Sequence, residues 1–255
     1  MYIELKPGDY NFIPPEKEGF FSRFLSILKS LSSLYGGVYT IIGLSVIFYV
    51  IAIIGSLVAS INFDYFLSIW ASNNYKIIIA LNSYYRWITA MFIHFGLIHL
   101  FLNMVGVYIL GSLLEKLWNK RIVFLVFFIS GILSNIASFY ILKGNSGGAS
   151  GGVFGLMGAA FSFFTFSSDV EPLFKNYMRQ QILSVIIINV ILSFILPSID
   201  FVGHLGGLIS GILLGLFIVK FRIKRNLFYL YFISLILIIV SLVLSIIDVI
   251  KLLSV

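Results

Sequence analysis

The chain has no cysteine and little charge. The lack of cysteine excludes disulfide bonds, thiol catalysis and cysteine-ligated metal sites. Charged residues make up only 11% of the 255 residues, too few to cover the surface of a soluble domain of this length. Hydrophobic residues make up 60%, and the mean hydropathy is +1.07. Long apolar runs separated by short charged loops predict a helical protein that crosses a membrane several times.

Seven apolar segments have roughly the 20-residue length that a bilayer core requires. They are Val38–Ala59, Ile93–Leu114, Ile122–Leu142, Ser150–Phe166, Gln180–Leu196, Gly203–Lys220 and Leu227–Ile247. Of the 17 Lys and Arg residues, all except Lys76, Arg86, Lys143 and Lys251 fall on the side of the N-terminus. Basic loops favour the cytoplasm, so we expect the N-terminus inside and the C-terminus outside. The net charge of +7 is then a topology signal, and no nucleic-acid partner is expected.

Two further segments are not expected to span the membrane. Apolar residues recur at helical spacing over Phe20–Leu31, with Arg23 and Lys29 among them, which predicts a short helix on the cytoplasmic membrane surface. A disordered leader is the alternative for this segment. The outer loop 60–90 is rich in aromatic residues, which favour the headgroup layer, so we expect it to be partly embedded in the outer leaflet.

Polar residues gather at the outer ends of three predicted spans. His94 and His99 begin the second span, with Asn103 one turn after His99. Ser150 begins the fourth span and His204 begins the sixth. These three spans run in the same direction, so their first residues share one depth, and His99, Asn103, Ser150 and His204 could meet in one pocket. Polar residues inside a membrane are costly and mark functional sites by default.

The fourth predicted span is too short to fill the membrane. From Ser150 to Phe166 it spans about 25 Å, against about 30 Å for a hydrocarbon core. With Asp169 held at the cytoplasmic face, Ser150 lies several ångströms below the outer surface. The irregular, glycine-rich segment 144–148 before it is tolerated at that depth only where it is buried in protein or lines a water-filled cavity. A serine beside a wet cavity is suited to hydrolysis within the membrane.

Glycines recur on the fourth and sixth predicted spans. They are Gly151, Gly155 and Gly158 in the fourth, and Gly203, Gly207, Gly211 and Gly215 in the sixth. Small residues at this spacing allow two membrane helices to approach closely. We expect this contact to bring the Ser150 hydroxyl within hydrogen-bond reach of His204. Helix packing alone explains the glycines, but it does not explain a serine and a histidine at matching ends.

Together these motifs resemble those of the rhomboid intramembrane serine proteases, from about Tyr84 to Lys220. The matching residues are Gly148, Ser150, Gly151 and Gly155 for the Gly-x-Ser-Gly-x-x-x-Gly element, His99 and Asn103 for His-x-x-x-Asn, the preceding His94, His204, Gly207 and Gly211 for the histidine–glycine element, Arg86 in the outer loop, and the loop glutamate Glu115. Tyr85 replaces the tryptophan that usually precedes the arginine. Phe154 replaces a tyrosine that often stacks on the catalytic histidine, and it keeps the stacking face but loses the hydroxyl.

The resemblance implies an all-α polytopic membrane protein, with a rhomboid-like six-helix core and an extra C-terminal transmembrane helix. We expect a cytoplasmic segment with an interfacial helix at 1–37, the protease core at 38–222, and the seventh span with a short outer tail at 223–255. The implied location is a bacterial plasma membrane.

The resemblance also implies the chemistry. Ser150 is the expected nucleophile and His204 its general base. The expected oxyanion donors are the Ser150 backbone N–H and the side chains of His99 and Asn103. The remaining matched residues, among them His94, are expected to be structural. The expected substrates are transmembrane segments of other membrane proteins, cut near the outer face through an acyl-enzyme, with no metal and no cofactor.

Three alternatives remain open at this point. Asp200, four residues before His204, could orient that histidine, although loop aspartates are usually only solvated. His94, His99 and His204 could form a metal site of an enzyme or transporter, but no embedded carboxylate supports them. The chain could also be a non-catalytic rhomboid-like protein that binds membrane proteins, although such relatives usually lack the serine or the histidine.

Overall fold

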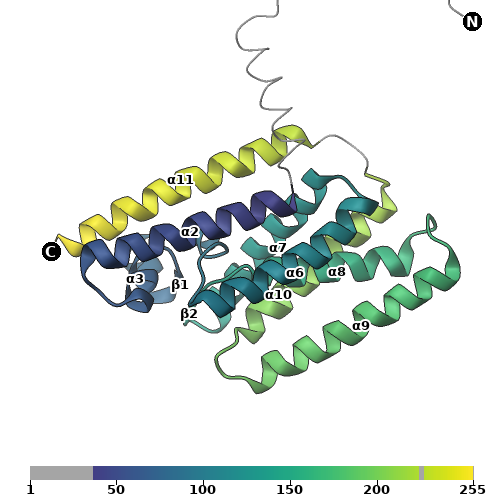
Figure 1. The fold of residues 1–255 in the computed structure, drawn as a ribbon, viewed down its shortest axis with the longest axis horizontal. Coiled ribbons are helices and arrows are strands. Elements are labelled where there is room, and N and C mark those ends of the chain that lie inside the picture. Colours follow the sequence, from purple (N-terminus) through teal and green to yellow (C-terminus); the bar gives the residue numbers. More distant parts are fainter. Residues whose placement is uncertain (1–36, 224–226, 255) are drawn as a thin grey trace, which may run out of the picture. The chain divides into compact units, whose positions relative to one another are not determined.

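The computed structural model describes residues 37–223 and 227–254 (Figure 1). Its long apolar helices are α2 (Val38–Ala59), α6 (Leu97–Leu117), α7 (Lys120–Ile141), α9 (Pro172–Ile195), α10 (Phe201–Lys220) and α11 (Phe228–Leu253). A shorter apolar helix, α8, covers Ser150–Phe166. These six long helices and α8 confirm the predicted all-α polytopic fold. The predicted surface helix at Phe20–Leu31 lies outside the described residues.

Two predicted spans begin four or more residues away from the start of the observed helix. The helix of the second predicted span, α6, begins at Leu97 rather than Ile93, because Gly96 has φ 119°, outside the helical range. His94 therefore precedes this helix and does not begin it. The helix of the fifth predicted span, α9, begins at Pro172 rather than Gln180. The Glu171 carboxylate accepts hydrogen bonds from the first free backbone N–H groups of this helix, and proline suits its first turn.

The outer loop contains three short helices. They are α3 (Phe63–Trp70), α4 (Tyr75–Leu81) and α5 (Arg86–Thr89). Asn62 and Asn74 cap the first two, each through a side-chain oxygen that accepts two backbone N–H groups. Between them, β1 (Asn73–Asn74) pairs antiparallel with β2 (Asn145–Ser146), which lies just before α8. The outer loop is thus joined directly to the segment that leads to Ser150.

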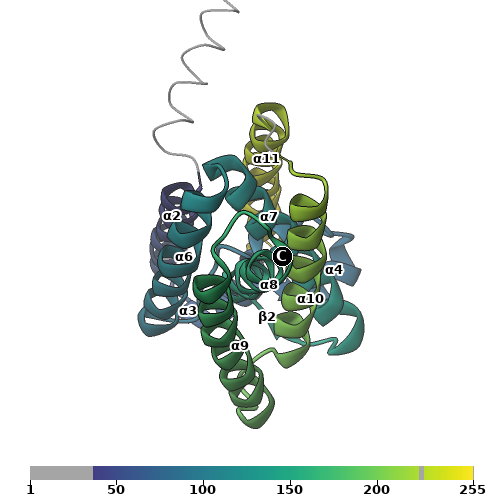
Figure 2. The same ribbon diagram turned by 90° about the vertical axis from the view of Figure 1, so that its right-hand side faces the viewer.

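The short helix α8 lies at the centre of the bundle (Figure 2). It contacts α6, α7, α9 and α10, and most of its residues are buried. A central helix does not need to reach both membrane surfaces, because neighbouring protein and loops cover its ends. This explains how a helix too short for the bilayer fits the fold.

Backbone-to-backbone contact joins α8 to α10. A Cβ atom added at Gly207 would meet the backbone of Gly151, and one at Gly211 would lie 2.6 Å from the Cα of Gly155. Gly215 meets Ala159 in the same way. The predicted close approach of the fourth and sixth spans is therefore present. The remaining glycine of the predicted sixth span, Gly203, does not take part in this contact. A Cβ atom added there would meet the Asp200 carboxylate instead.

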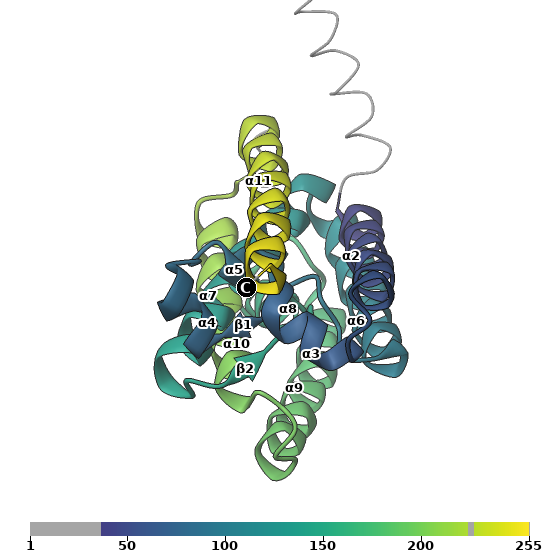
Figure 3. The ribbon, with the colours of Figure 1, turned by 90° about the vertical axis from the view of Figure 1, so that its left-hand side faces the viewer.

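The last helix, α11, packs against the outer loop (Figure 3). Asp248 of α11 accepts a hydrogen bond from the Tyr85 hydroxyl, and its Oδ2 lies 3.9 Å from Nη2 of Arg86. Burial, followed by the hydrogen bond to Asp248, raises the pKa of Tyr85 above its ordinary value, so the phenol remains the donor. This contact ties the extra C-terminal helix to α5.

Candidate active site

One cavity of about 1160 Å³ opens among α6, α8, α9 and α10. Besides Asp200, which directly precedes α10, five of the residues singled out in the sequence line it: His99, Asn103, Ser150, Phe154 and His204. They come from three helices that begin at the same end of the bundle (Figure 1). The structure thus brings together polar groups that lie up to about a hundred residues apart in the chain.

Ser150 is the first residue of α8, and the turn before it is held on both sides. Gly148 donates its N–H to the carbonyl of Ala90 at 2.8 Å, and Ala149 donates its N–H to Nε2 of His94 at 3.3 Å. Gly148 has φ 134°, a conformation that residues with a Cβ atom rarely adopt. The serine is therefore presented by a turn that is anchored on both sides and that requires glycine at position 148.

His99 and Asn103 lie against this turn. A Cβ atom added at Gly148 would lie 2.9 Å from Nε2 of His99 and 3.8 Å from Nδ2 of Asn103. Asn103 uses one amide hydrogen to reach the carbonyl of His99 at 3.0 Å, which leaves its second hydrogen for another acceptor. Two potential donors thus face the backbone beside Ser150, and only glycine leaves room for them.

His204 is fixed by two contacts. Phe154 stacks on its ring, with centroids 4.2 Å apart and planes 22° apart. Nδ1 of His204 lies 2.7 Å from the hydroxyl of Ser193 on α9. In the described structure His204 forms no hydrogen bond with Ser150, so the direct contact expected from the sequence is absent.

Asp200 does not orient His204. Its carboxylate caps α10, with Oδ1 accepting the N–H of Gly203 at 2.7 Å. Its backbone carbonyl accepts the N–H of His204, which is an ordinary first-turn bond. Asp200 therefore caps α10, and the hydrogen bond of the His204 ring is formed with Ser193. The sequence interpretation missed Ser193. The signal for Ser193 was its polarity within an apolar span, four residues after Asn189.

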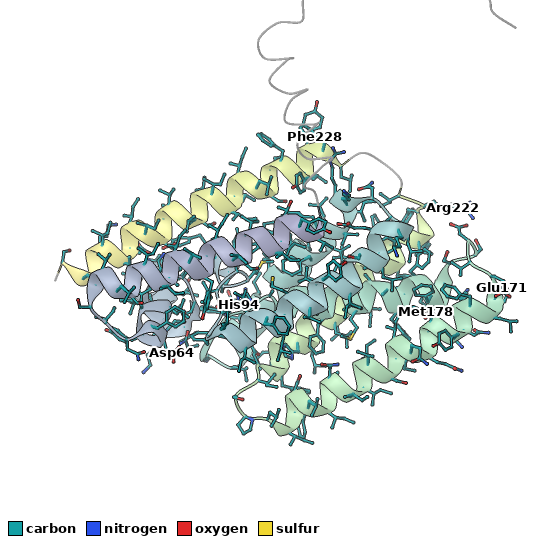
Figure 4. The ribbon with its side chains drawn as sticks, in the orientation of Figure 1. Asp64, His94, Glu171, Met178, Arg222 and Phe228 are labelled. Atoms are coloured by element: carbon teal, nitrogen blue, oxygen red, sulfur yellow. The ribbon has the colours of Figure 1, made fainter. Side chains whose placement is uncertain are left out.

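His94 supports the turn and is not among the residues that line the cavity. In Figure 4 its label lies inside the bundle, whereas those of Asp64 and Glu171 lie at the edges. His94 is fully buried, its Nδ1 lies 3.2 Å from the carbonyl of Phe92, and its Nε2 accepts the N–H of Ala149. These two contacts require the proton on Nδ1. Burial lowers the pKa of His94 to about 3, so the imidazole is neutral at ordinary pH.

The other matched residues lie away from the cavity. Arg86 is fully buried and donates to the Ser83 hydroxyl and to the carbonyl of Ile69. Glu115 was expected in a loop but lies within α6, where it accepts the N–H of Val38 at 2.7 Å and caps α2. Gly151 lies against Ser134 of α7 and Gly207 of α10.

The polar anchors of the outer loop were not foreseen. Asn73 donates to the carbonyl of Asn135, and Asn135 donates to the carbonyl of Trp87. Ser72 donates to Asn145 at 2.6 Å. These amide contacts hold the loop onto α7 and onto the segment before Ser150. Among the described residues, no group of three or more His, Asp or Glu side chains could hold a metal ion.

A family model described as the Rhomboid domain matches residues 81–221, more than half of the chain. Rhomboid protease GluP of Bacillus subtilis (strain 168) is 33% identical over 134 residues, which are 52% of this chain and 26% of that protein. Putative rhomboid protease YdcA of the same organism is 30% identical over 153 residues, or 59% of this chain and 75% of that protein. Inactive rhomboid protein 2 of Homo sapiens is 30% identical over 135 residues, or 52% of this chain and 15% of that protein. The match thus spans only about a quarter of GluP.

Proposed function

The chain belongs to the rhomboid family, and on that premise we propose that it is an intramembrane serine protease. The observation that carries the proposal is the shared cavity, which is lined by Ser150, His204, His99 and Asn103. A nucleophile, a base and two donors of charge-stabilising hydrogen bonds are the groups that acyl transfer needs.

In this proposal Ser150 attacks the substrate carbonyl. The Ser150 Oγ–carbon bond forms while Nε2 of His204 takes the hydroxyl proton. The carbon–nitrogen bond then breaks, and His204 returns the proton to the leaving amine. The same imidazole then takes a proton from water as the water oxygen bonds to the acyl carbon. The bond from that carbon to Ser150 Oγ breaks, and His204 returns the proton to the serine. No metal or cofactor enters the sequence of steps.

The negative oxygen of the tetrahedral intermediate needs donors beside Ser150. The Ser150 backbone N–H at the first turn of α8 has no helical partner, and the positive end of the helix dipole lies there. His99 and the second amide hydrogen of Asn103 face the same turn, as the crowding around Gly148 indicates. Each such donor contributes about 3 kcal/mol to catalysis in a preorganised site.

We propose that the substrates are transmembrane segments of other membrane proteins, cut near the outer face. The cavity is lined by residues of α6 and α9, and in the family the substrate enters between the corresponding second and fifth spans. A segment that unwinds easily would reach Ser150 most readily, because free backbone groups are tolerated in a wet cavity.

We further propose that the chain is a multi-pass protein of a bacterial plasma membrane, with its N-terminus in the cytoplasm and its C-terminus outside. The start of α2 and the end of α11 lie at opposite ends of the bundle, as this topology requires (Figure 1). The segments 1–37, 38–222 and 223–255 remain the proposed cytoplasmic segment, protease core and extra span.

A second candidate is a non-catalytic protein that binds membrane proteins, because one relative carries the word inactive in its name. Cleavage separates the two. The full chain is placed in liposomes with a fluorescent transmembrane reporter peptide, and the products are weighed by mass spectrometry. We expect cleavage by the wild type and by Ser184→Ala, which removes an exposed hydroxyl that does not line the cavity. Ser150→Ala and His204→Ala should each abolish it. Binding without cleavage in every protein would favour the second candidate.

A further inference from the structure

Ser193 is a buried serine on α9 that the proposed mechanism does not use. Its side chain is 4% exposed, and its hydroxyl oxygen lies 2.7 Å from Nδ1 of His204. The same oxygen lies 2.7 Å from the backbone carbonyl of Asn189, one turn earlier in α9. The hydroxyl therefore has two close partners, a ring nitrogen and a carbonyl oxygen.

The two partners determine where the protons are. A carbonyl oxygen only accepts, so the single hydroxyl hydrogen of Ser193 is donated to Asn189. The contact with His204 must then use a lone pair of the hydroxyl oxygen, and the hydrogen in that contact comes from Nδ1 of the ring. A neutral imidazole carries one N–H, so Nε2 of His204 is left without a proton. That is the tautomer a general base needs.

We propose that Ser193 is a positioning residue that holds His204 in its Nδ1–H tautomer, with Nε2 directed to the Ser150 proton. This inference rests on the proposed protease function and deepens it. Phe154 determines the plane of the ring by stacking, and Ser193 determines its rotation within that plane. Asp200, the acidic residue nearest in sequence, is occupied in capping α10.

The position of Ser193 also ties the base to α9. This helix is the least buried of the six long apolar helices, with 17% of its most apolar stretch buried in the described structure. Few contacts therefore hold it in place, and a displacement of α9 would break the bond between Ser193 and His204. A substrate that enters beside α9 would thus act on the orientation of the base as well as on access to Ser150.

The experiment compares three variants in the full chain in detergent. Ser193→Ala removes the contact, Ser193→Thr keeps a hydroxyl at the same place, and Ser184→Ala is the matched control. Ser184 lies on the same helix and makes the same backbone bond one turn back, but it is exposed and touches no histidine. We expect kcat to fall about fivefold to tenfold in Ser193→Ala with KM unchanged. Ser193→Thr should keep most of the wild-type kcat, and Ser184→Ala should have the same kcat and KM as the wild type.

Nitrogen-15 NMR of histidine-labelled protein gives a readout that does not depend on activity. The chain has three histidines, and the His204 signals are those missing from His204→Ala. We expect a protonated Nδ1 and a bare Nε2 in the wild type, and a mixture of tautomers in Ser193→Ala. An unchanged tautomer together with unchanged kcat in Ser193→Ala would overturn the inference. If the wild type cleaves nothing while the tautomer still depends on Ser193, the protease function fails but the positioning role stands.

Discussion

The contact between α8 and α10 leads to a quantitative prediction for Gly211→Ala. Gly211 lies two turns beyond His204 on α10 and does not line the cavity. The added Cβ would lie 2.6 Å from both the Cα and the carbonyl carbon of Gly155. Carbon atoms without a bond between them prefer separations of about 3.5–4.0 Å. The two helices must therefore separate by about 1 Å, since backbone atoms cannot rotate away.

The cost follows from that separation. Overpacking of this kind destabilises a protein by about 1–3 kcal/mol. For a chain of this size, this corresponds to a fall in Tm of about 2–12 °C. The same movement displaces Ser150 on α8 from His204 on α10. A misplacement of about 1 Å lowers the rate of a catalysed reaction about a hundredfold.

The assay measures Tm and reporter cleavage side by side. Gly43→Ala is the matched control, because Gly43 lies within α2 and a Cβ added there meets nothing within 4 Å. Alanine favours a helix over glycine, so Gly43→Ala should keep its activity and a Tm equal to or above that of the wild type. If Gly211→Ala behaved like Gly43→Ala in both measurements, the argument that glycine contact positions the two residues would be refuted.

Three further predictions follow from the surroundings of the cavity. Because burial lowers the pKa of His94 to about 3, against about 6.5 in an unfolded chain, the unfolded state binds the proton first as the pH falls. Stability should therefore be lost as the pH falls from about 6.5 toward 3. The fall in Tm between pH 7 and pH 5 should be smaller in His94→Gln than in the wild type. Asp248→Ala leaves the Tyr85 hydroxyl and the buried Arg86 without their acidic partner, and it should lower Tm by about 4–8 °C in a thermal scan. Cleavage should survive dialysis against EDTA, and loss of activity that zinc restores would favour the metal alternative.

The helices were the part of the fold best predicted from the sequence. Two spans, Val38–Ala59 and Ser150–Phe166, have the predicted bounds, because apolar composition and the flanking glycines and serines mark their ends. The start of α9 was misjudged, because Lys175, Asn176 and Arg179 interrupt the apolar run in its first two turns. Hydropathy locates the part of a helix that suits lipid, and a capping residue such as Glu171 decides where the helix begins.

The meeting of the polar residues at one cavity was predicted, but their detailed contacts were not. Motif spacing and a common depth were enough to place Ser150, His204, His99 and Asn103 at one cavity. The partner of the His204 ring could not be found in this way, because Ser193 carries no charge and belongs to no glycine motif. Which hydroxyl meets which ring nitrogen depends on the packing of α9 against α10, and hydrophobic patterning does not encode that.

The central claim is that Ser150 is a nucleophile activated by His204, and covalent labelling tests it most directly. The full chain in detergent is treated with a fluorophosphonate probe, and the modified residue is identified by mass spectrometry. The account predicts a single adduct on Ser150, absent from Ser150→Ala and strongly reduced in His204→Ala, while Ser184→Ala labels like the wild type. Labelling that persists in Ser150→Ala, or a wild type that reacts no faster than His204→Ala, would contradict it.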